Sequence, residues 1–188
     1  NSDEPLNKHD HIIFNLDDGK QLRYNDTRKF GRMKLVSLDN YANELPLSKL
    51  GPEPFYADEK KLYEKLHKCN LPIKHALLDQ SIIAGIGNIY ANEICFAMGL
   101  DPYTPASKLT KKSVKELIEV ASNILNEAIK QGGTTIHSFS ANGIDGLFQV
   151  KLKVHLQKKC PICGGEITKE AIKGRGTYYC KKCQKRRR

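Results

Sequence analysis

The sequence has 188 residues, which is enough for one large domain or two small ones. Its 31 basic residues outnumber 21 acidic residues and give a formal net charge of +10, which favours a polyanionic partner, above all nucleic acid, over a basic protein without such a partner. No apolar run reaches the roughly 18 residues of a membrane span, and the polar start lacks a signal-peptide pattern, so we expect a cytoplasmic protein. In that compartment its six cysteines suggest metal ligands rather than disulfides, although Cys69 and Cys95 lie outside the metal-binding pattern described below.

Strands are predicted at the start of the chain. Apolar residues alternate in HIIFNLDDGKQLRYND at 11–26, and Asp18-Gly19 in its middle suits a hairpin turn. A third apolar run, RMKLVSL at 32–38, predicts a third strand. Three strands with one apolar face do not close a core by themselves. We therefore expect residues 1–45 to be the end of an N-terminal β-sandwich whose earlier strands precede residue 1.

Helices are predicted next. The prolines and the glycine of ELPLSKLGPEP at 44–54 indicate a linker between domains. The stretch DEKKLYEKLHK at 58–68 predicts a short amphipathic helix. The stretch IKHALLDQSIIA at 73–84 predicts a second helix, which ends at the turn GIGN.

Two further helices are predicted, over 89–98 and over 111–131. Asn88 is expected to cap the first and Thr110 the second, and each helix is expected to stop at a glycine. The helices on either side of GIGN form a helix–turn–helix-like pair.

The remaining sequence predicts a loop at 134–149 and a strand over LFQVKLKVHLQ at 147–157 that leads into a cysteine-rich hairpin. The chain is therefore expected to be α+β, with the sandwich end at 1–45, a helical domain at 46–147 and a finger at 148–188.

Four cysteines follow the spacing Cys-x2-Cys-x16-Cys-x2-Cys, at Cys160, Cys163, Cys180 and Cys183. Two Cys-x-x-Cys pairs that converge on one ion provide the tetrahedral sulfur ligands of structural zinc, so one Zn²⁺ is expected. The alternatives are an iron–sulfur cluster and a redox pair, which lacks its usual strand–helix setting here. A closed zinc site does no chemistry, but it stabilises a segment that is too short to build a core.

Arg175 lies between two glycines at 174–176, which we expect to form the tip of the hairpin between the cysteine pairs. On a rigid hairpin, a guanidinium can donate two hydrogen bonds to one phosphate. The alternative is a turn arginine that contacts only solvent.

Together these features resemble one family, the bacterial formamidopyrimidine-DNA glycosylases (Fpg/MutM), which remove oxidised purines from DNA. The matching stretches occur in family order over nearly the whole chain: KHDH at 8–11, LRYNDTRKFGRM at 22–33, LGPEP at 50–54, LLDQSIIAGIGNIYANEICFAMGLDP at 77–102, QGGTTI at 131–136, GLFQ at 146–149 and the cysteine hairpin. Endonuclease VIII-like glycosylases for oxidised pyrimidines share the helical core and the finger but generally lack the RKFG-type motif, which favours the first family.

The resemblance implies a helix-two-turn-helix DNA-binding domain followed by a zinc-ribbon-like β-hairpin finger. It implies a glycosylase and abasic-site lyase for 8-oxoguanine and formamidopyrimidines, which works through a Schiff base. The implied partner is damaged double-stranded DNA, bound by a monomer in the bacterial cytoplasm at the nucleoid, with no membrane involved. Zinc is the only cofactor implied.

The resemblance also implies roles for residues of the helical domain and the finger. Asn88 and Arg175 would hold the backbone at the damaged nucleotide. Arg175 is the candidate catalytic residue, since the family assigns it a proton-donor role in the later elimination. Lys74 would contact a phosphate, and the loop at 137–147 would close over the flipped base.

Three residues near the start of the chain have implied roles in DNA contact. Phe30 would wedge between stacked bases and Arg28 would contact the base left without its partner, because chemistry on a base requires that it be flipped out. The alternative for Phe30 is a core aromatic residue. His9 would contact the DNA.

Two departures from the family pattern stand out. The motif usually reads Asp-Pro-Arg-Arg-Phe-Gly, whereas here Thr27 replaces the proline, which should loosen the turn but keep the wedge. The family nucleophile is an N-terminal proline amine, which would precede residue 1. The 188 residues alone are therefore expected to be inactive, and the alternative function is a non-catalytic module that binds damaged DNA.

Overall fold

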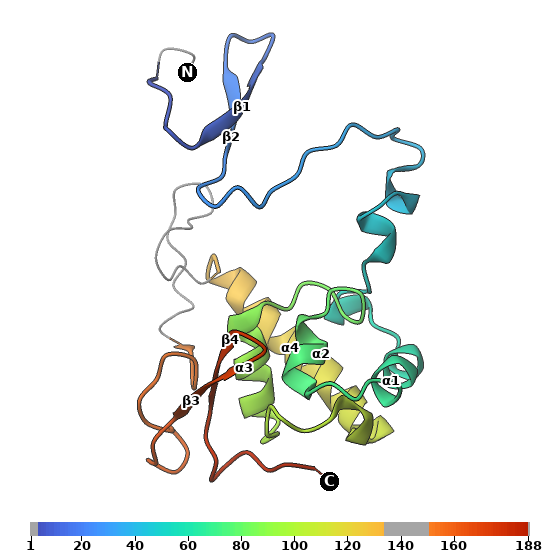
Figure 1. Cartoon of the computed structure of the whole chain (residues 1–188), viewed down its shortest axis with the longest axis vertical. Helices are drawn as coiled ribbons and strands as arrows, with labels where there is room; N and C mark the ends of the chain where they lie inside the picture. The colour runs from blue at the N-terminus through green and yellow to red at the C-terminus, as the bar shows by residue number, and fades with distance from the viewer. Residues whose placement is uncertain (1–3, 134–150, 188) are drawn as a thin grey trace. The chain divides into compact units, whose positions relative to one another are not determined.

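The computed structural model describes residues 4–133 and 151–187 (Figure 1). The chain divides into two compact units, Asn1–Glu44 and Leu45–Arg188. The boundary lies at the N-terminal end of the predicted linker. Within the described ranges, no helix is long and apolar enough to cross a membrane.

The first unit contains the predicted hairpin. Strands β1 (Asp10–Asn15) and β2 (Gln21–Asn25) pair antiparallel. Gly19 has a φ of 76°, a backbone conformation that glycine adopts without steric cost, and it lies in the turn between the strands. The prediction of this hairpin is confirmed.

The predicted third strand over 32–38 is wrong. Among the described residues of this unit, only β1 and β2 are strands, and the run at 32–38 has none of the regular pairing that defines a strand. The side chains of Leu35 and Leu38 are 99% and 86% exposed. An apolar run becomes a strand only where a partner offers main-chain groups and an apolar face, and the described part of this unit provides neither to 32–38.

The second unit is built around four helices: α1 (Glu59–His67), α2 (Ile73–Leu78), α3 (Asn88–Ala97) and α4 (Lys111–Lys130). Short 3₁₀ turns lie at Leu47–Lys49, Pro54–Tyr56 and Ala106–Lys108. Each helix contributes buried side chains to one core, among them Leu66, Leu77, Ile94 and Leu117, all at most 1% exposed.

Most of the predicted helix ends are confirmed. The Asp58 carboxylate accepts a hydrogen bond from Lys61 N at 2.8 Å, and the Thr110 hydroxyl accepts one from Ser113 N at 3.2 Å, so both are side-chain caps. Gly99 follows α3 with a φ of 58°, and Gly132 follows α4 with a φ of 71°. These left-handed residues end their helices where the sequence predicts.

The helix predicted over 73–84 is shorter than expected, since α2 ends at Leu78. Asp79 takes an extended conformation, and its carboxylate accepts hydrogen bonds from Ser81 N at 2.9 Å and from Ser81 Oγ at 2.6 Å. Such local side-chain bonds compete with the helical ladder. The chain therefore leaves the helix early and forms a longer turn before α3.

The finger ends the unit and packs against α3 (Figure 1). Its strands β3 (Thr168–Ile172) and β4 (Arg175–Tyr179) pair antiparallel. The observed elements thus confirm an α+β fold, with a helical domain followed by a β-hairpin finger. The predicted loop at 137–147 lies outside the described residues.

Candidate nucleic-acid interface and zinc site

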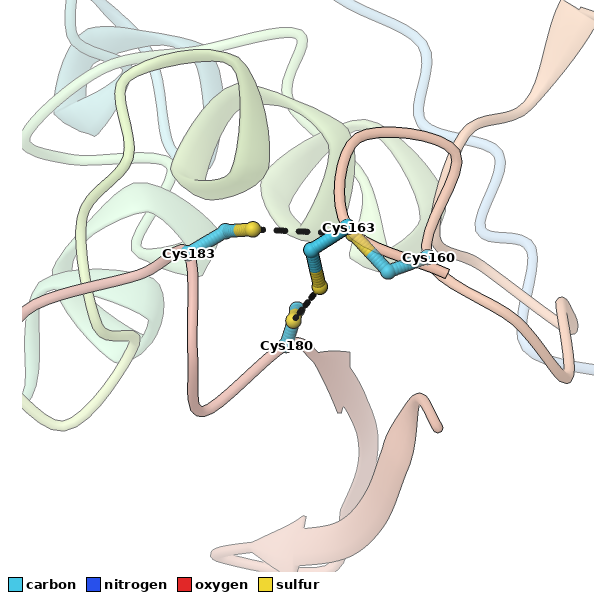
Figure 2. A group of neighbouring side chains, drawn as sticks. All are labelled: Cys160, Cys163, Cys180 and Cys183. Carbon is cyan, nitrogen blue, oxygen red and sulfur yellow. Dashed lines mark hydrogen bonds between the residues drawn. The ribbon is translucent and has the colours of Figure 1, made fainter. Parts of the chain in front are cut away.

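The four predicted metal ligands come together at the base of the finger. Their sulfur atoms all lie within 4.8 Å of one another, and Figure 2 shows the side chains turned toward one another. The Sγ atoms of Cys160 and Cys183 are 3.7 Å apart, and those of Cys163 and Cys180 are 3.6 Å apart. Four sulfurs at about 2.3 Å from a central zinc ion would be about 3.8 Å apart. These distances fit one tetrahedral zinc site and are far too long for disulfides.

The backbone around the first cysteine pair forms a tight turn that brings its two sulfur atoms together. Gly164 follows the first cysteine pair with a φ of 69°, and its N–H donates to the Cys160 carbonyl at 2.9 Å, which closes the turn that a metal ligand pair needs. A hydrogen bond from the Gly165 backbone lowers the pKa of Cys163 to about 7, which favours the thiolate that binds metal.

Arg175 is the first residue of β4 rather than the centre of the turn. Lys173 and Gly174 have φ angles of 45° and 76°, and Ile172 pairs directly with Arg175. The turn is therefore the two-residue type in which both residues have positive φ. The sequence prediction of a tip at 174–176 is shifted by one residue, and the exposed Arg175 side chain starts from a regular strand.

Lys74 and Asn88 attach the finger to the helical domain. Lys74 Nζ donates to the Gly176 carbonyl and to Thr177 Oγ1, each at 2.8 Å. Asn88 Nδ2 donates to the same Gly176 carbonyl at 3.1 Å. The sequence predicts a phosphate contact for Lys74, but the structure buries this residue, with 1% exposed, and directs its ammonium at the finger backbone. Burial lowers the pKa of Lys74 to about 8.

Asn88 is not the helix cap that the sequence predicts. Gly87 occupies the cap position, and Asn88 is the first residue of α3. Its Nδ2 faces the finger, while its buried Oδ1 has no hydrogen-bond partner. Because the first N–H groups of a helix lack partners within the helix, the start of α3 attracts anions. The structure thus brings this helix start next to the strand that begins with Arg175.

In the first unit, the predicted wedge is presented on a tight loop. The Asp26 carboxylate accepts hydrogen bonds from the main-chain N–H groups of Arg28, Lys29 and Gly31, at 3.0, 3.0 and 2.7 Å. These bonds, that of Gly31 above all, lower the pKa of Asp26. Phe30 is 79% exposed, which is not the environment of a core aromatic residue.

Arg28 and His9 lie close to this loop. The Arg28 guanidinium carbon is 5.7 Å from the centre of the Phe30 ring, within cation–π range. The His9 carbonyl accepts from Asp26 N at 3.0 Å. The three residues that the resemblance selects in this unit therefore lie around one loop.

A buried polar cluster that was not predicted from the sequence lies between α3 and the segment that enters the finger. The Glu93 carboxylate accepts three main-chain hydrogen bonds, from Lys153, Val154 and His155, at 2.8, 3.0 and 2.8 Å. This explains why 151–157, the described part of the strand predicted over 147–157, is not a strand: three successive N–H groups in its middle bind a side chain instead of a neighbouring strand. Polar residues in the middle of the apolar helix NIYANEICFA were the available signal.

Asn92 and His155 belong to the same cluster. Asn92 Nδ2 lies 2.7 Å from His155 Nδ1, and Asn92 Oδ1 accepts from Tyr178 N at 3.4 Å. Asn92 is 1% exposed and His155 is 6% exposed. Burial, together with the charge of Lys74, lowers the pKa of His155 to about 4. The imidazole is therefore neutral at pH 7, and its Nδ1 can accept the amide hydrogen.

The lowered pKa of His155 leads us to expect that the folded chain is less stable at acidic pH. The pKa of His155 is lower in the folded state than the usual value near 6.5. The unfolded chain therefore takes up the proton first, and stability that is fully present above pH 6.5 is lost as the pH falls toward 4. Between pH 6.5 and pH 5 this loss should be about 2 kcal/mol. Unfolding by urea across this range, with zinc in excess, measures it.

The His155→Gln variant should flatten this pH dependence, since it has no group that titrates there. The His67→Gln variant is the control for the substitution itself, because it makes the same change at an exposed histidine outside the buried cluster. An unaltered pH dependence in the His155→Gln variant would contradict the assignment.

Three family models together match most of the chain. Residues 1–33 match the formamidopyrimidine-DNA glycosylase N-terminal domain, and residues 50–140 match the formamidopyrimidine-DNA glycosylase H2TH domain. Residues 157–186 match a zinc finger found in FPG and IleRS. The last match agrees with the geometry of the four cysteines, which form a site for one structural zinc ion.

Similar proteins of known name agree with these matches. The formamidopyrimidine-DNA glycosylase of Bacillus licheniformis is 46% identical, over 98% of this chain and 69% of that protein, and that of Bacillus subtilis is 45% identical, over 97% and 68%. The Lactococcus lactis Fpg in complex with DNA containing an abasic site superposes with a TM-score of 0.88 at 41% identity, covering 98% of this chain and 69% of that one. The Thermus thermophilus MutM (FPG) protein gives 0.86 at 34% identity, covering 96% and 70%. The chain belongs to the formamidopyrimidine-DNA glycosylase family.

Proposed function

We propose that this chain works in base-excision repair as the DNA-binding, wedge and zinc-finger parts of a glycosylase and abasic-site lyase for oxidised purines. The observation that carries the proposal is the junction of α3 and β4, where Asn88, at the start of α3, donates to the carbonyl of Gly176, the residue after Arg175. A helix start, an amide and a guanidinium in one place suit a single phosphate. In this proposal the substrate is damaged double-stranded DNA in the bacterial cytoplasm, at the nucleoid.

The proposed roles divide between binding and support. Asn88 and Arg175 hold the backbone of the flipped nucleotide, and Arg175 also assists the elimination step through its charge. A guanidinium keeps its proton and its positive charge near neutral pH, so its electrostatic contribution outweighs literal proton donation. Lys74 does not contact DNA in this proposal. Its ammonium donates hydrogen bonds to Gly176 and Thr177 and so supports the finger.

Phe30, Arg28 and His9 form the second part of the proposal. The exposed Phe30 ring replaces the stacking of the flipped base, and Arg28 contacts the base left opposite. His9 contacts the backbone beside them. The fixed Asp26 loop limits the freedom of the wedge before DNA binds, despite the threonine at position 27.

The chemistry implied by the family requires an amine. The amine attacks C1′ of the damaged nucleotide, the bond from C1′ to the base breaks, and the resulting Schiff base drives strand cleavage by elimination. The residues proposed to contact DNA do not supply that amine, and the ammonium of Lys74 is hydrogen-bonded to the finger.

Salt dependence of DNA binding tests the phosphate grip, which is the proposed contact of Asn88 and Arg175 with one phosphate. The Arg175→Gln variant should bind a duplex with 8-oxoguanine opposite cytosine about tenfold more weakly and should reduce the slope of log K against log salt by about one. Asn88→Ala should weaken binding to damaged and undamaged duplexes alike. Lys112→Gln is the matched control, because it removes one exposed charge from α4 and should leave the slope unchanged. An unchanged slope in the Arg175→Gln variant would remove Arg175 from the phosphate contacts.

Borohydride trapping on the same duplex tests the chemistry. A covalent adduct would show that an amine of this chain reaches C1′. A gel shift without an adduct would show that these residues bind damaged DNA and do not supply the nucleophile.

A further inference from the structure

The outer edge of β4 is paired with the side chains of a helix. In an antiparallel pair, alternate residues of a strand direct their N–H and C=O groups toward the partner strand, and the residues between them direct theirs away. Gly176 and Tyr178 are two apart on β4, and their main-chain groups meet α3: Asn88 Nδ2 donates to Gly176 O at 3.1 Å, and Tyr178 N donates to Asn92 Oδ1 at 3.4 Å.

The spacing of the two asparagines matches the strand. Four residues of an α-helix rise about 6.0 Å, and two residues of a β-strand rise about 6.7 Å. Asn88 and Asn92 therefore meet Gly176 and Tyr178 without distortion of either element. If β4 slipped by one residue along α3, the asparagines would face residues whose N–H and C=O groups already pair with β3. The slip would also turn every side chain of β4, Arg175 included, to the opposite face.

His155 fixes which way the Asn92 amide points. Its neutral Nδ1 accepts from Asn92 Nδ2 at 2.7 Å, which leaves Asn92 Oδ1 to accept from Tyr178 N. The reversed amide would place two donors against each other at Tyr178. Two contacts hold His155 in place. Its main-chain N–H donates to the Glu93 carboxylate, and the centre of its ring lies 4.8 Å from the centre of the Tyr178 ring. All these groups are buried, so water cannot replace a lost partner.

We infer that Asn92 is a positioning residue for the phosphate grip: it sets the register of β4 on α3, so that Arg175 and Asn88 act on the same phosphate. Asn92 touches no DNA in this role. The inference rests on the proposed function of Arg175 and Asn88, and it adds a residue that neither the zinc site nor the phosphate grip contains.

A pair of variants separates register from packing. Asn92→Leu keeps the branched shape of the side chain but removes both hydrogen bonds, so it should weaken binding to the 8-oxoguanine duplex about tenfold and reduce the salt slope by about one. Asn92→Asp keeps an oxygen for Tyr178 N–H, and its second oxygen can bind a protonated His155, so it should retain the slope. Combining Asn92→Leu with Arg175→Gln should weaken binding no further than Arg175→Gln alone, because both remove the same contact.

Each variant is compared only when it is folded and holds one zinc ion per chain. A folded Asn92→Leu variant with the wild-type slope, or a loss that adds fully to that of Arg175→Gln, would overturn the inference. If Asn92→Leu does not fold, amide exchange in the wild-type chain decides: the Tyr178 N–H should exchange slowly, and fast exchange would refute its bond to Asn92.

A measurement without DNA separates this inference from the proposed function. In the wild-type chain, NMR cross-relaxation should connect the Asn88 amide with Gly176, and Asn92→Leu should abolish it. If Arg175→Gln leaves the salt slope unchanged, the phosphate grip fails. If the Asn88–Gly176 contact survives in Asn92→Leu, the register role of Asn92 fails.

Discussion

Removal of zinc is expected to unfold the finger and to weaken DNA binding by at least tenfold. The finger buries few side chains of its own, and its small cluster includes two of the metal ligands, Cys160 and Cys180. Ordering a residue costs about 1–2 kcal/mol of backbone entropy, so such a cluster cannot order the segment 157–186. Structural zinc contributes about 10–16 kcal/mol in comparable small domains. Without zinc, β4 should no longer be ordered, and Arg175 should lose its fixed position.

Two routes remove the metal, namely a chelator and the Cys163→Ser variant. Zinc content, the NMR dispersion of residues 157–186 and a gel shift on the damaged duplex measure the outcome. Cys69→Ser is the matched control, because it makes the same change at a half-buried thiol outside the cluster and should keep the zinc ion and the affinity. A metal-free chain that binds DNA like the wild type would show that the finger is not part of the grip.

Local sequence signals predicted a large part of this structure. Asp18-Gly19 marked the hairpin turn, Thr110 marked the start of α4, and Gly99 marked the end of α3. These signals work because a turn or a cap depends on neighbouring residues alone. The cysteine spacing was equally informative, since four thiolates in two close pairs have few other uses.

The failures came from contacts between distant residues. Lys74 has the sequence character of a surface cation, but it donates to the finger backbone more than 100 positions later. The segment at 151–157 alternates like a strand, but its N–H groups are taken by one carboxylate on α3. Asn88 looks like a cap, but its amide faces Gly176. No local pattern contains the partner in these cases, so tertiary structure decides the outcome.

Loss of the Glu93 carboxylate is expected to destabilise the helical domain strongly. Glu93 is 5% exposed, and its two oxygens accept from three successive main-chain N–H groups. The Glu93→Ala variant would leave these donors buried and unpaired, at about 1–3 kcal/mol each when no water reaches them. Partial relaxation should reduce the total, so we expect about 3–5 kcal/mol lost from the free energy of unfolding, measured by urea denaturation.

The Glu93→Gln variant tests the same point more gently, because one oxygen remains to accept from Val154 and His155 while the new amide opposes Lys153 N–H. Its cost should be about 1–3 kcal/mol, the cost of one unpaired buried donor. Glu127→Ala is the matched control: this exposed carboxylate on α4 pairs with Lys130 at 3.0 Å and with Lys151 at 3.7 Å. Exposed ion pairs contribute at most about 1 kcal/mol. If Glu93→Ala cost no more than Glu127→Ala, the three main-chain bonds would not stabilise the entry to the finger, and the finger would be held to the helical domain by its other contacts, such as those of Asn88 and Asn92 on α3 and of Lys74 on α2.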